Sequence, residues 1–215
     1  MNTAHDYISQ LAQHYQQYYG VEGRKHTLDK GPREKLPPVF YVLEIPPNKR
    51  HGAFVYCTVG MSADRTDDNL IELFVFSPKS DPKLVELLTY CASYHRTGRP
   101  LNIHHTVNIG QPWLDSSVCD HAFISLPYLE EEGFGIFPFD NREIHCYWLI
   151  PITKEERSYK VENGCEALEQ LFEEKELDYI NPKRKCLVTG KMTSFFYYGG
   201  LPTVIIASAL FGFSS

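Results

Sequence analysis

The sequence predicts an α+β fold, a three-layer α/β/α sandwich around a central mixed, largely antiparallel sheet. Compact runs at residues 39–45, 53–60 and 70–76 are dense in β-branched and aromatic residues, which indicates strands. These runs barely alternate between apolar and polar residues, so both faces of the sheet are expected to be covered. Helical periodicity precedes and follows the strands, which favours helices packed on each side.

The expected helices have apolar residues at steps of three and four. The first covers residues 3–19 and stops at Gly20. The second is capped by Asp81, begins with Pro82 and ends at the Thr-Gly pair 97–98. Thr153 and Glu156 have the spacing of a capping box that opens a third helix, and a helical pattern continues over 165–177.

Two more strands are expected, at 121–127 and 143–152, whereas the Gly-, Pro- and charge-rich stretch 20–38 is expected to be a loop. We expect a single domain over 1–188, followed by an apolar C-terminal extension over 189–215. The apolar stretch 201–213 is too short to span a membrane and is broken by Pro202 and Gly212. No membrane association is therefore predicted.

Composition favours a soluble binding protein with a neutral or basic partner. The chain has 215 residues, a formal net charge of -6 and a pI near 5.8. A nucleic-acid binder needs a basic surface to displace phosphate counterions, so nucleic acid is not an expected partner. The polar start of the chain lacks the pattern of a secretory leader, which predicts the cytoplasm. Six scattered cysteines without a paired spacing are expected to be small core residues.

A group of potential metal ligands surrounds the double histidine: His104, His105, Cys119, Asp120 and His121. If 104–108 is extended, the two histidines point to opposite faces, so only one can join Cys119 and His121. A further ligand would have to come from His145, Cys146 or a distant loop. No zinc-binding spacing is present, so no metal and no cofactor are predicted.

The same region contains the residue types of a nucleophilic site, namely Ser116, Ser117, Cys119, Asp120 and His121. Neighbouring residues on a strand do not easily turn toward one another, and there is no nucleophile elbow or phosphate-binding glycine loop. The chain is therefore predicted not to be an enzyme. The alternative is a small metal- or Cys/His-dependent hydrolase that uses His105, Cys119 and His121.

Two loops favour protein binding. Trp113 lies in a loop over 110–117 and is either packed in the core or offered to a partner. The segment 126–139 contains the acids Glu130, Glu131 and Glu132 among Phe and Tyr residues. It is either a solvated turn over buried aromatics or an aromatic centre with an acidic rim, which would hold a basic partner.

Several ordered blocks resemble one family: "LLTYCASYHRTGRPLNIHHTVNIGQPW", "SSVCDHAFISLPYLEE", "YWLIPITKEE" and "NGCEALEQLFE". Together they are similar to the bacterial branch of the suppressor-of-fused family, over about 37–188. The resemblance implies a mixed sheet between helical layers and a non-catalytic, protein-binding role. Animal members restrain a transcription factor of Hedgehog signalling by gripping a short peptide. Bacterial members are associated with immunity proteins that neutralise polymorphic toxins.

The resemblance also implies a binding face. Animal members carry Gly-Asp-His-Val where this chain has "HHTV", so His105 replaces the peptide-contacting aspartate, and Tyr94 matches an aromatic residue near the groove. The predicted partner-binding residues are Tyr94, His104, His105, Trp113, Asp120, His121 and Tyr128. The predicted function is that of an immunity protein whose partner is a basic toxin domain. A regulatory scaffold that binds a host factor is a further alternative.

Overall fold

The computed structural model describes residues 4–188 and the backbone of 203–205. The chain forms two compact units, the first made of Met1–Ile103 and Ile124–Leu149 and the second of His104–Phe123 and Ile150–Ser215. Most strand pairings among the described residues of the first unit are antiparallel, while residues 71–74 run parallel to residues 145–148. The predicted α+β class with a mixed, largely antiparallel sheet is confirmed.

The sheet of the first unit is built around three central strands. β2 (Tyr41–Ile45), β3 (Phe54–Val59) and β4 (Ile71–Ser77) are successive antiparallel neighbours, and β1 (Arg24–His26) adds to β2. β8 (Arg142–Ile152) pairs in parallel with β4, and β7 (Ile136–Phe139) pairs with β8 in antiparallel fashion. Every residue of β2 and β4 is buried, Glu44 and Glu72 included, as their mostly apolar sequences predict.

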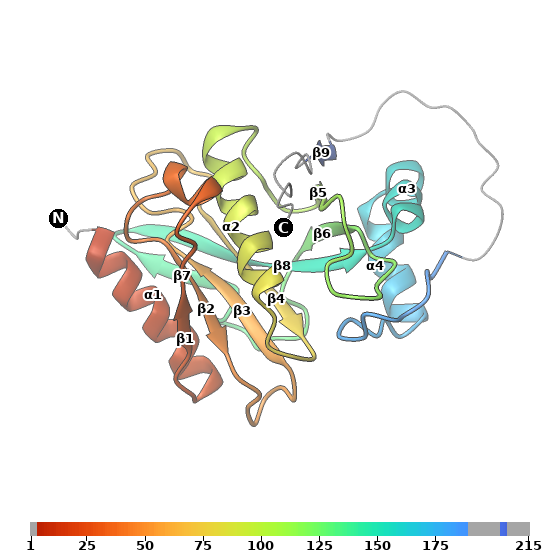
Figure 1. Cartoon of the computed structure of the whole chain (residues 1–215), viewed down its shortest axis with the longest axis horizontal. Coiled ribbons are helices and arrows are strands. Elements are labelled where there is room, and N and C mark those ends of the chain that lie inside the picture. Colours follow the sequence, from red (N-terminus) through yellow and green to blue (C-terminus); the bar gives the residue numbers. More distant parts are fainter. Residues whose placement is uncertain (1–3, 189–202, 206–215) are drawn as a thin grey trace, which may run out of the picture. The chain divides into compact units, whose positions relative to one another are not determined.

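Helices cover both faces of this sheet, as Figure 1 shows for α1 (Ala4–Tyr19) and α2 (Pro82–Thr97). Tyr15 of α1 contacts the thiol of Cys146 on β8, at 3.3 Å. On α2, the backbone N–H of the capping residue Asp81 donates to the hydroxyl of Tyr56 on β3. The side chain of Asp81 accepts from the Lys83 N–H, so the predicted cap is confirmed.

The second unit contains β5 (Thr106–Asn108), paired with the first residues of β6 (His121–Ser125), and the helices α3 (Lys154–Asn163) and α4 (Cys165–Glu174). β9 (Thr203–Ile205) pairs in parallel with β5. The predicted capping box opens α3, with reciprocal hydrogen bonds between Thr153 and Glu156. The ring of Phe172 on α4 meets Phe123 of β6 edge-on, at 6.4 Å between ring centroids.

Some predicted loops contain short regular elements. The stretch 20–38 includes β1 and a 3-10 helix, Gly31–Lys35, and β7 lies inside the predicted loop 126–139. β1 consists of polar residues, which an edge strand tolerates because one of its sides stays in water. Its pairing with β2 is therefore not visible in an apolar pattern.

Two predictions about the chain as a whole stay predictions. The single domain over 1–188 is one of them, and the extension over 189–215 lies outside the described residues except for the backbone of β9. Among the helices of residues 4–188, none combines the length and the apolar content that crossing a bilayer requires.

Candidate functional site

The predicted partner-binding residues are divided between the two units. Tyr94 and Tyr128 belong to the first unit, and the other five to the second: His104, His105, Trp113, Asp120 and His121. Each group is described within its own unit.

The double histidine does not form an extended pair. His104 has a positive φ of 64°, and the strand starts only at Thr106, so the condition of an extended 104–108 is not met. The ring of His104 stacks on Phe123 with an interplanar angle of 5°, and its Nε2 lies 3.9 Å from Oε1 of Glu169. A positive φ of this kind is uncommon for residues other than glycine.

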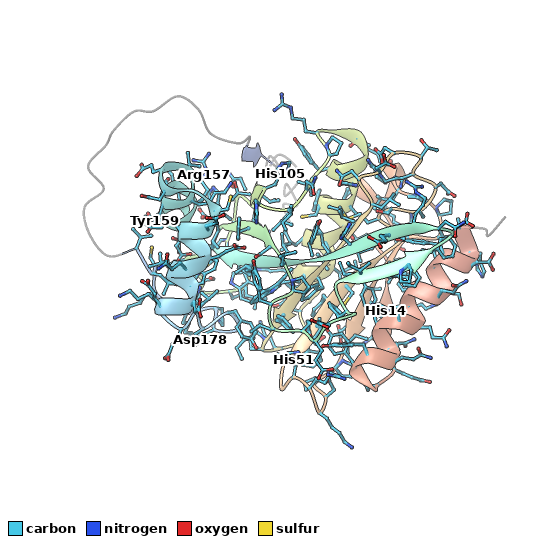
Figure 2. All side chains as sticks on the ribbon, turned by 180° about the vertical axis from the view of Figure 1, so that it is seen from behind. His14, His51, His105, Arg157, Tyr159 and Asp178 are labelled. Atoms are coloured by element: carbon cyan, nitrogen blue, oxygen red, sulfur yellow. The ribbon has the colours of Figure 1, made fainter. Side chains whose placement is uncertain are left out.

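His105 is half-buried and is labelled in Figure 2. Burial lowers the pKa of its imidazole, and the positive charges of Lys160 and His104 lower it further. The ring is therefore neutral at physiological pH.

Asp120 and His121 form a close pair, with 2.7 Å between Oδ1 of Asp120 and Nδ1 of His121. Asp120 precedes the first residue of β6, so the two residues are not neighbours within a strand and their side chains can meet. The backbone of this segment is also fixed, since the Trp113 N–H donates to the Cys119 carbonyl at 3.0 Å. The Trp113 side chain is only 3% exposed and packs in the interior of the unit.

The chemistry expected of a hydrolase is poorly supported in this region. Burial raises the pKa of the Cys119 thiol to about 11, so the nucleophilic thiolate is scarce at neutral pH. Within residues 4–188, no three His, Cys, Asp or Glu side chains gather closely enough to hold a metal ion. The six cysteines are all free thiols, four of them buried: Cys57, Cys91, Cys119 and Cys146.

Tyr94 and Tyr128 differ in their surroundings. Tyr94, on α2, is half-buried with its ring over Gly98, and its carbonyl accepts the Gly98 N–H at 2.7 Å. A side chain at position 98 would collide with that ring, because a Cβ there would lie 2.9 Å from it. Tyr128 is 60% exposed. It lies in the loop between β6 and β7.

Three further apolar side chains of this loop and of β7 are exposed. Leu126, Leu129 and Ile136 are 38%, 44% and 45% exposed, and with Tyr128 they form what we call the 126–136 patch. A tight turn shapes the loop, because the Tyr128 N–H donates to the Leu126 carbonyl and the Glu130 N–H to that of Pro127. Pro127 packs on Gly135, where a Cβ would lie 2.9 Å from its ring. Both ends of the patch are thereby held together.

Glu130 anchors this loop from inside. Its side chain is 1% exposed and accepts hydrogen bonds from the hydroxyls of Tyr18 and Tyr19, at 2.9 and 2.8 Å. His51, labelled in Figure 2, lies on the turn between β2 and β3, with its Nε2 3.1 Å from Glu130. The idea that all three acids of 130–132 form a solvated rim is therefore wrong for Glu130. Only Glu131 and Glu132 are exposed.

Arg50 reinforces the same anchor from the surface. Its Nε donates to the Tyr18 carbonyl at 2.7 Å, and its guanidinium lies 4.3 Å from the centroid of the Tyr18 ring. It also forms an ion pair with Glu131, at 2.7 Å. Three segments distant in sequence therefore meet here: the end of α1, the β2–β3 turn and the 130–131 loop.

Of the exposed apolar side chains in 126–139, only Tyr128 was predicted from the sequence to bind a partner. The exposure of Leu126, Leu129 and Ile136 and the anchoring role of Glu130 were not predicted. A run of three glutamates gives no sign of which one is buried, because that depends on the tyrosines of a helix more than 100 positions earlier.

The fold of this chain is similar to that of solved suppressor-of-fused structures. The chain matches a homologue of suppressor of fused from Neisseria gonorrhoeae FA 1090 at 30% identity, with a TM-score of 0.75, covering 87% of this chain and all of that one. A structure of the Sufu–Fu complex matches at 12% identity and a TM-score of 0.65, covering 84% of this chain and 92% of that chain. Drosophila Suppressor of Fused matches at 11% identity and a TM-score of 0.63, covering 82% of this chain and 50% of that chain. The last two likenesses concern the fold alone.

The family follows from the sequence model of suppressor of fused protein (SUFU), which matches residues 37–185. The chain belongs to this family. A search of curated proteins found no match. Membership supports a protein-binding domain without catalytic activity, in line with the buried thiol of Cys119.

Proposed function

We propose that this chain is an immunity protein, a non-catalytic domain that neutralises a basic toxin domain by binding it through the 126–136 patch. The proposal is supported by exposed apolar side chains on a loop that the buried side chain of Glu130 holds in place. Tyr128 is the most exposed of the large apolar side chains in the described part of the chain, yet the neighbouring Glu130 is almost fully buried.

Such an arrangement is what a docking surface requires. Exposed apolar and aromatic side chains gain free energy when a partner removes them from water, and aromatic residues are common among those that contribute most to binding. A loop held by a buried hydrogen-bonded carboxylate loses little conformational entropy on binding. The patch is thus organised before a partner arrives.

Charge favours a basic partner. Glu132 is exposed beside the patch, as is Glu131, which is paired with Arg50, and Glu143 is exposed next to β7, where it pairs with Pro138. The whole chain carries a formal net charge of -6. Opposite potentials raise the rate of encounter and exclude acidic competitors. A cytoplasmic location agrees with this role, because an immunity protein acts where a toxin would damage its producer.

The test is rescue of growth when a basic toxin domain encoded beside this gene is expressed together with the chain. We expect the wild type to restore growth and to form a complex with the purified toxin domain. The combined variant Leu126→Ser/Tyr128→Ser is expected to lose both, while circular dichroism stays unchanged. Val161→Ser is the matched control, because Val161 on α3 has the same 38% exposure as Leu126.

Three results would overturn the proposal. Full rescue of growth by the patch variant would show that the patch does not take part in toxin binding. Stoichiometric zinc in the purified protein, lost on changing His121 to Ala, would favour the hydrolase that uses His105, Cys119 and His121. Binding to a host factor, with no toxin domain recognised, would favour the regulatory scaffold.

A further inference from the structure

A pocket of about 210 Å³ opens in the first unit, between the first turns of α1, the 60–70 loop that joins β3 to β4, and the turn from β7 to β8. Its floor is apolar and includes Tyr7, Leu70 and Ile144, all buried. Phe139 forms an aromatic wall with Tyr7, their rings meeting edge-on at 5.2 Å between centroids. The pocket is smaller than the usual cavity for a drug-sized ligand, so it suits a single side chain.

The 60–70 loop is held in place by arginines. Arg96 donates to the carbonyls of Met61 and Ala63, at 3.2 and 2.7 Å. Arg142 donates to the carbonyl of Arg65 at 2.7 Å and to that of Asp67. The pocket wall is therefore preformed.

The guanidinium groups that line the pocket are already engaged. Arg65 forms a two-point ion pair with Asp67 and donates to the His95 carbonyl, at 3.2 Å. Arg142 is bound to the two loop carbonyls. Neither arginine presents an unoccupied fork to an incoming anion.

The carboxylates that line the pocket are not engaged in the same way. Asp64 and Asp140 are exposed, and among residues 4–188 neither takes part in a hydrogen bond or a close ion pair. Both sit on turns at positive φ, 59° and 52°. Asp64 acts on Arg96 only through a Coulombic effect that favours the charged guanidinium.

A third carboxylate lies directly behind the wall. Oε1 of Glu72 accepts from the Tyr7 hydroxyl at 2.6 Å and from the Ser62 N–H at 3.1 Å, and both of these residues line the pocket. All the groups that donate to Glu72 are neutral, since Oε2 accepts from Thr58 and Oε1 also from the Gly60 N–H. Because burial raises the pKa of Glu72 to about 7, this carboxyl carries only part of a negative charge at neutral pH, and it gains charge when a cation lies nearby.

We propose that this pocket receives the side chain of one lysine or arginine of the basic partner, with the aliphatic stem on the apolar floor and the cation between Asp64 and Asp140. The inference rests on the proposed function, because it assigns a second contact to the same partner. Aromatic faces and carboxylates together are the surroundings that an organic cation prefers. Tyr7 and Phe139 supply the first, and the acids supply the second.

The test uses two capped peptides, acetyl-Gly-Arg-Gly-amide and acetyl-Gly-Gln-Gly-amide, titrated into the full chain and followed by amide chemical shifts. The arginine peptide is expected to bind with a Kd on the order of millimolar and to shift the amides of 62–65 and 139–142. The glutamine peptide is expected to bind at least about five-fold more weakly, and added salt should reduce the difference. Bound cation should also lower the pKa of Glu72, seen in its carboxyl carbon shift.

The combined variant Asp64→Asn/Asp140→Asn should weaken binding of the arginine peptide at least about five-fold. Asp68→Asn is the matched control, because Asp68 is exposed in the same loop but does not line the pocket. Equal binding of the two peptides, or unchanged binding by the double Asn variant, would overturn the inference. The peptide titration is repeated with the Leu126→Ser/Tyr128→Ser variant to separate the two proposals. If this variant no longer binds the toxin domain but still binds the arginine peptide, the effect is confined to the 126–136 patch and the pocket is intact.

Discussion

Two buried glutamates, one in each unit, have different hydrogen-bond partners. Glu72 in the first unit accepts hydrogen bonds only from neutral hydroxyl and backbone N–H groups. Glu156 in the second unit forms a two-point ion pair with Arg184, each N–O distance being 2.7 Å. Burial raises the pKa of Glu72 from 4.5 to about 7.

The comparison teaches that the two carboxylates have different structural roles. Glu156 also accepts the N–H groups of Thr153 and Leu187, so the pair with Arg184 fixes the segment after α4 to the start of α3. Glu72 holds α1 and the turn at 60–62 with groups that bind a carboxylate without neutralising it. Because the pKa of Glu72 lies at about 7, the contribution of Glu72 to stability depends on pH near neutrality.

The largest effect is expected from removing the cation. Arg184→Gln leaves Glu156 buried without its partner and should lower the free energy of unfolding by about 3–5 kcal/mol, measured by urea denaturation. The double variant Arg184→Gln/Glu156→Gln should recover more than half of the loss, because the unpaired charge is gone. Lys183→Gln is the control, since Lys183 is exposed. A loss as small as that of the control would contradict the assigned role.

A smaller and pH-dependent effect is expected at Glu72. A carboxyl group whose pKa is higher in the folded state stabilises the fold most below its unfolded pKa, and this contribution is lost as the pH rises through the folded value. Between pH 4.5 and 8, Glu72 should therefore lower the stability of the wild type by roughly 3 kcal/mol.

Glu72→Gln should remove this dependence. The free energy of unfolding of the variant relative to the wild type is expected to rise steadily from pH 5 to pH 8 in urea titrations. Glu143→Gln, which changes an exposed glutamate of the same unit, should run parallel to the wild type. A difference between Glu72→Gln and the wild type that is constant with pH would show that Glu72 titrates normally.

The smallest effect on stability is expected from removing one hydrogen bond to Glu72. Tyr7→Phe removes the 2.6 Å donor of Glu72. The variant should lose about 1.5–3 kcal/mol at pH 8, where the acceptor is charged, and about 1 kcal/mol at pH 5. The same change in the Glu72→Gln background should cost an equal amount at both pH values. If the two backgrounds give the same pH profile, the hydroxyl does not act through the charge of Glu72.

The sequence predicted much of the fold, because its main signals are local. The helix around Leu84 and Leu88, its Asp81 cap and the Thr153–Glu156 capping box need only neighbours within a few turns of chain. The apolar runs of β2 and β4 indicated strands covered on both faces, and the family blocks indicated the protein class. β1 and β7 were missed, because their pairing depends on partners rather than on their own composition.

The candidate site was predictable only in part. The segment around Tyr128 attracts attention by its composition, but nothing near it in sequence says that Glu130 is inside and Glu131 outside. Trp113 is the opposite case, because its loop sequence was compatible with an exposed side chain, whereas the side chain is buried in the structure. In both cases the side chain's position depends on residues far away in the chain.

The sequence by itself determined the secondary elements with strong periodicity, the acidic balance and the family, because propensity, charge and motif order are properties of the chain. Only the tertiary structure decided which carboxylates are buried, which are balanced by a cation and which remain open around a pocket. Those outcomes follow from distances between segments such as α1, the 60–70 loop and the β7–β8 turn. The desolvation and Coulombic energies that govern a charged group depend on such distances in space, not on separation along the chain.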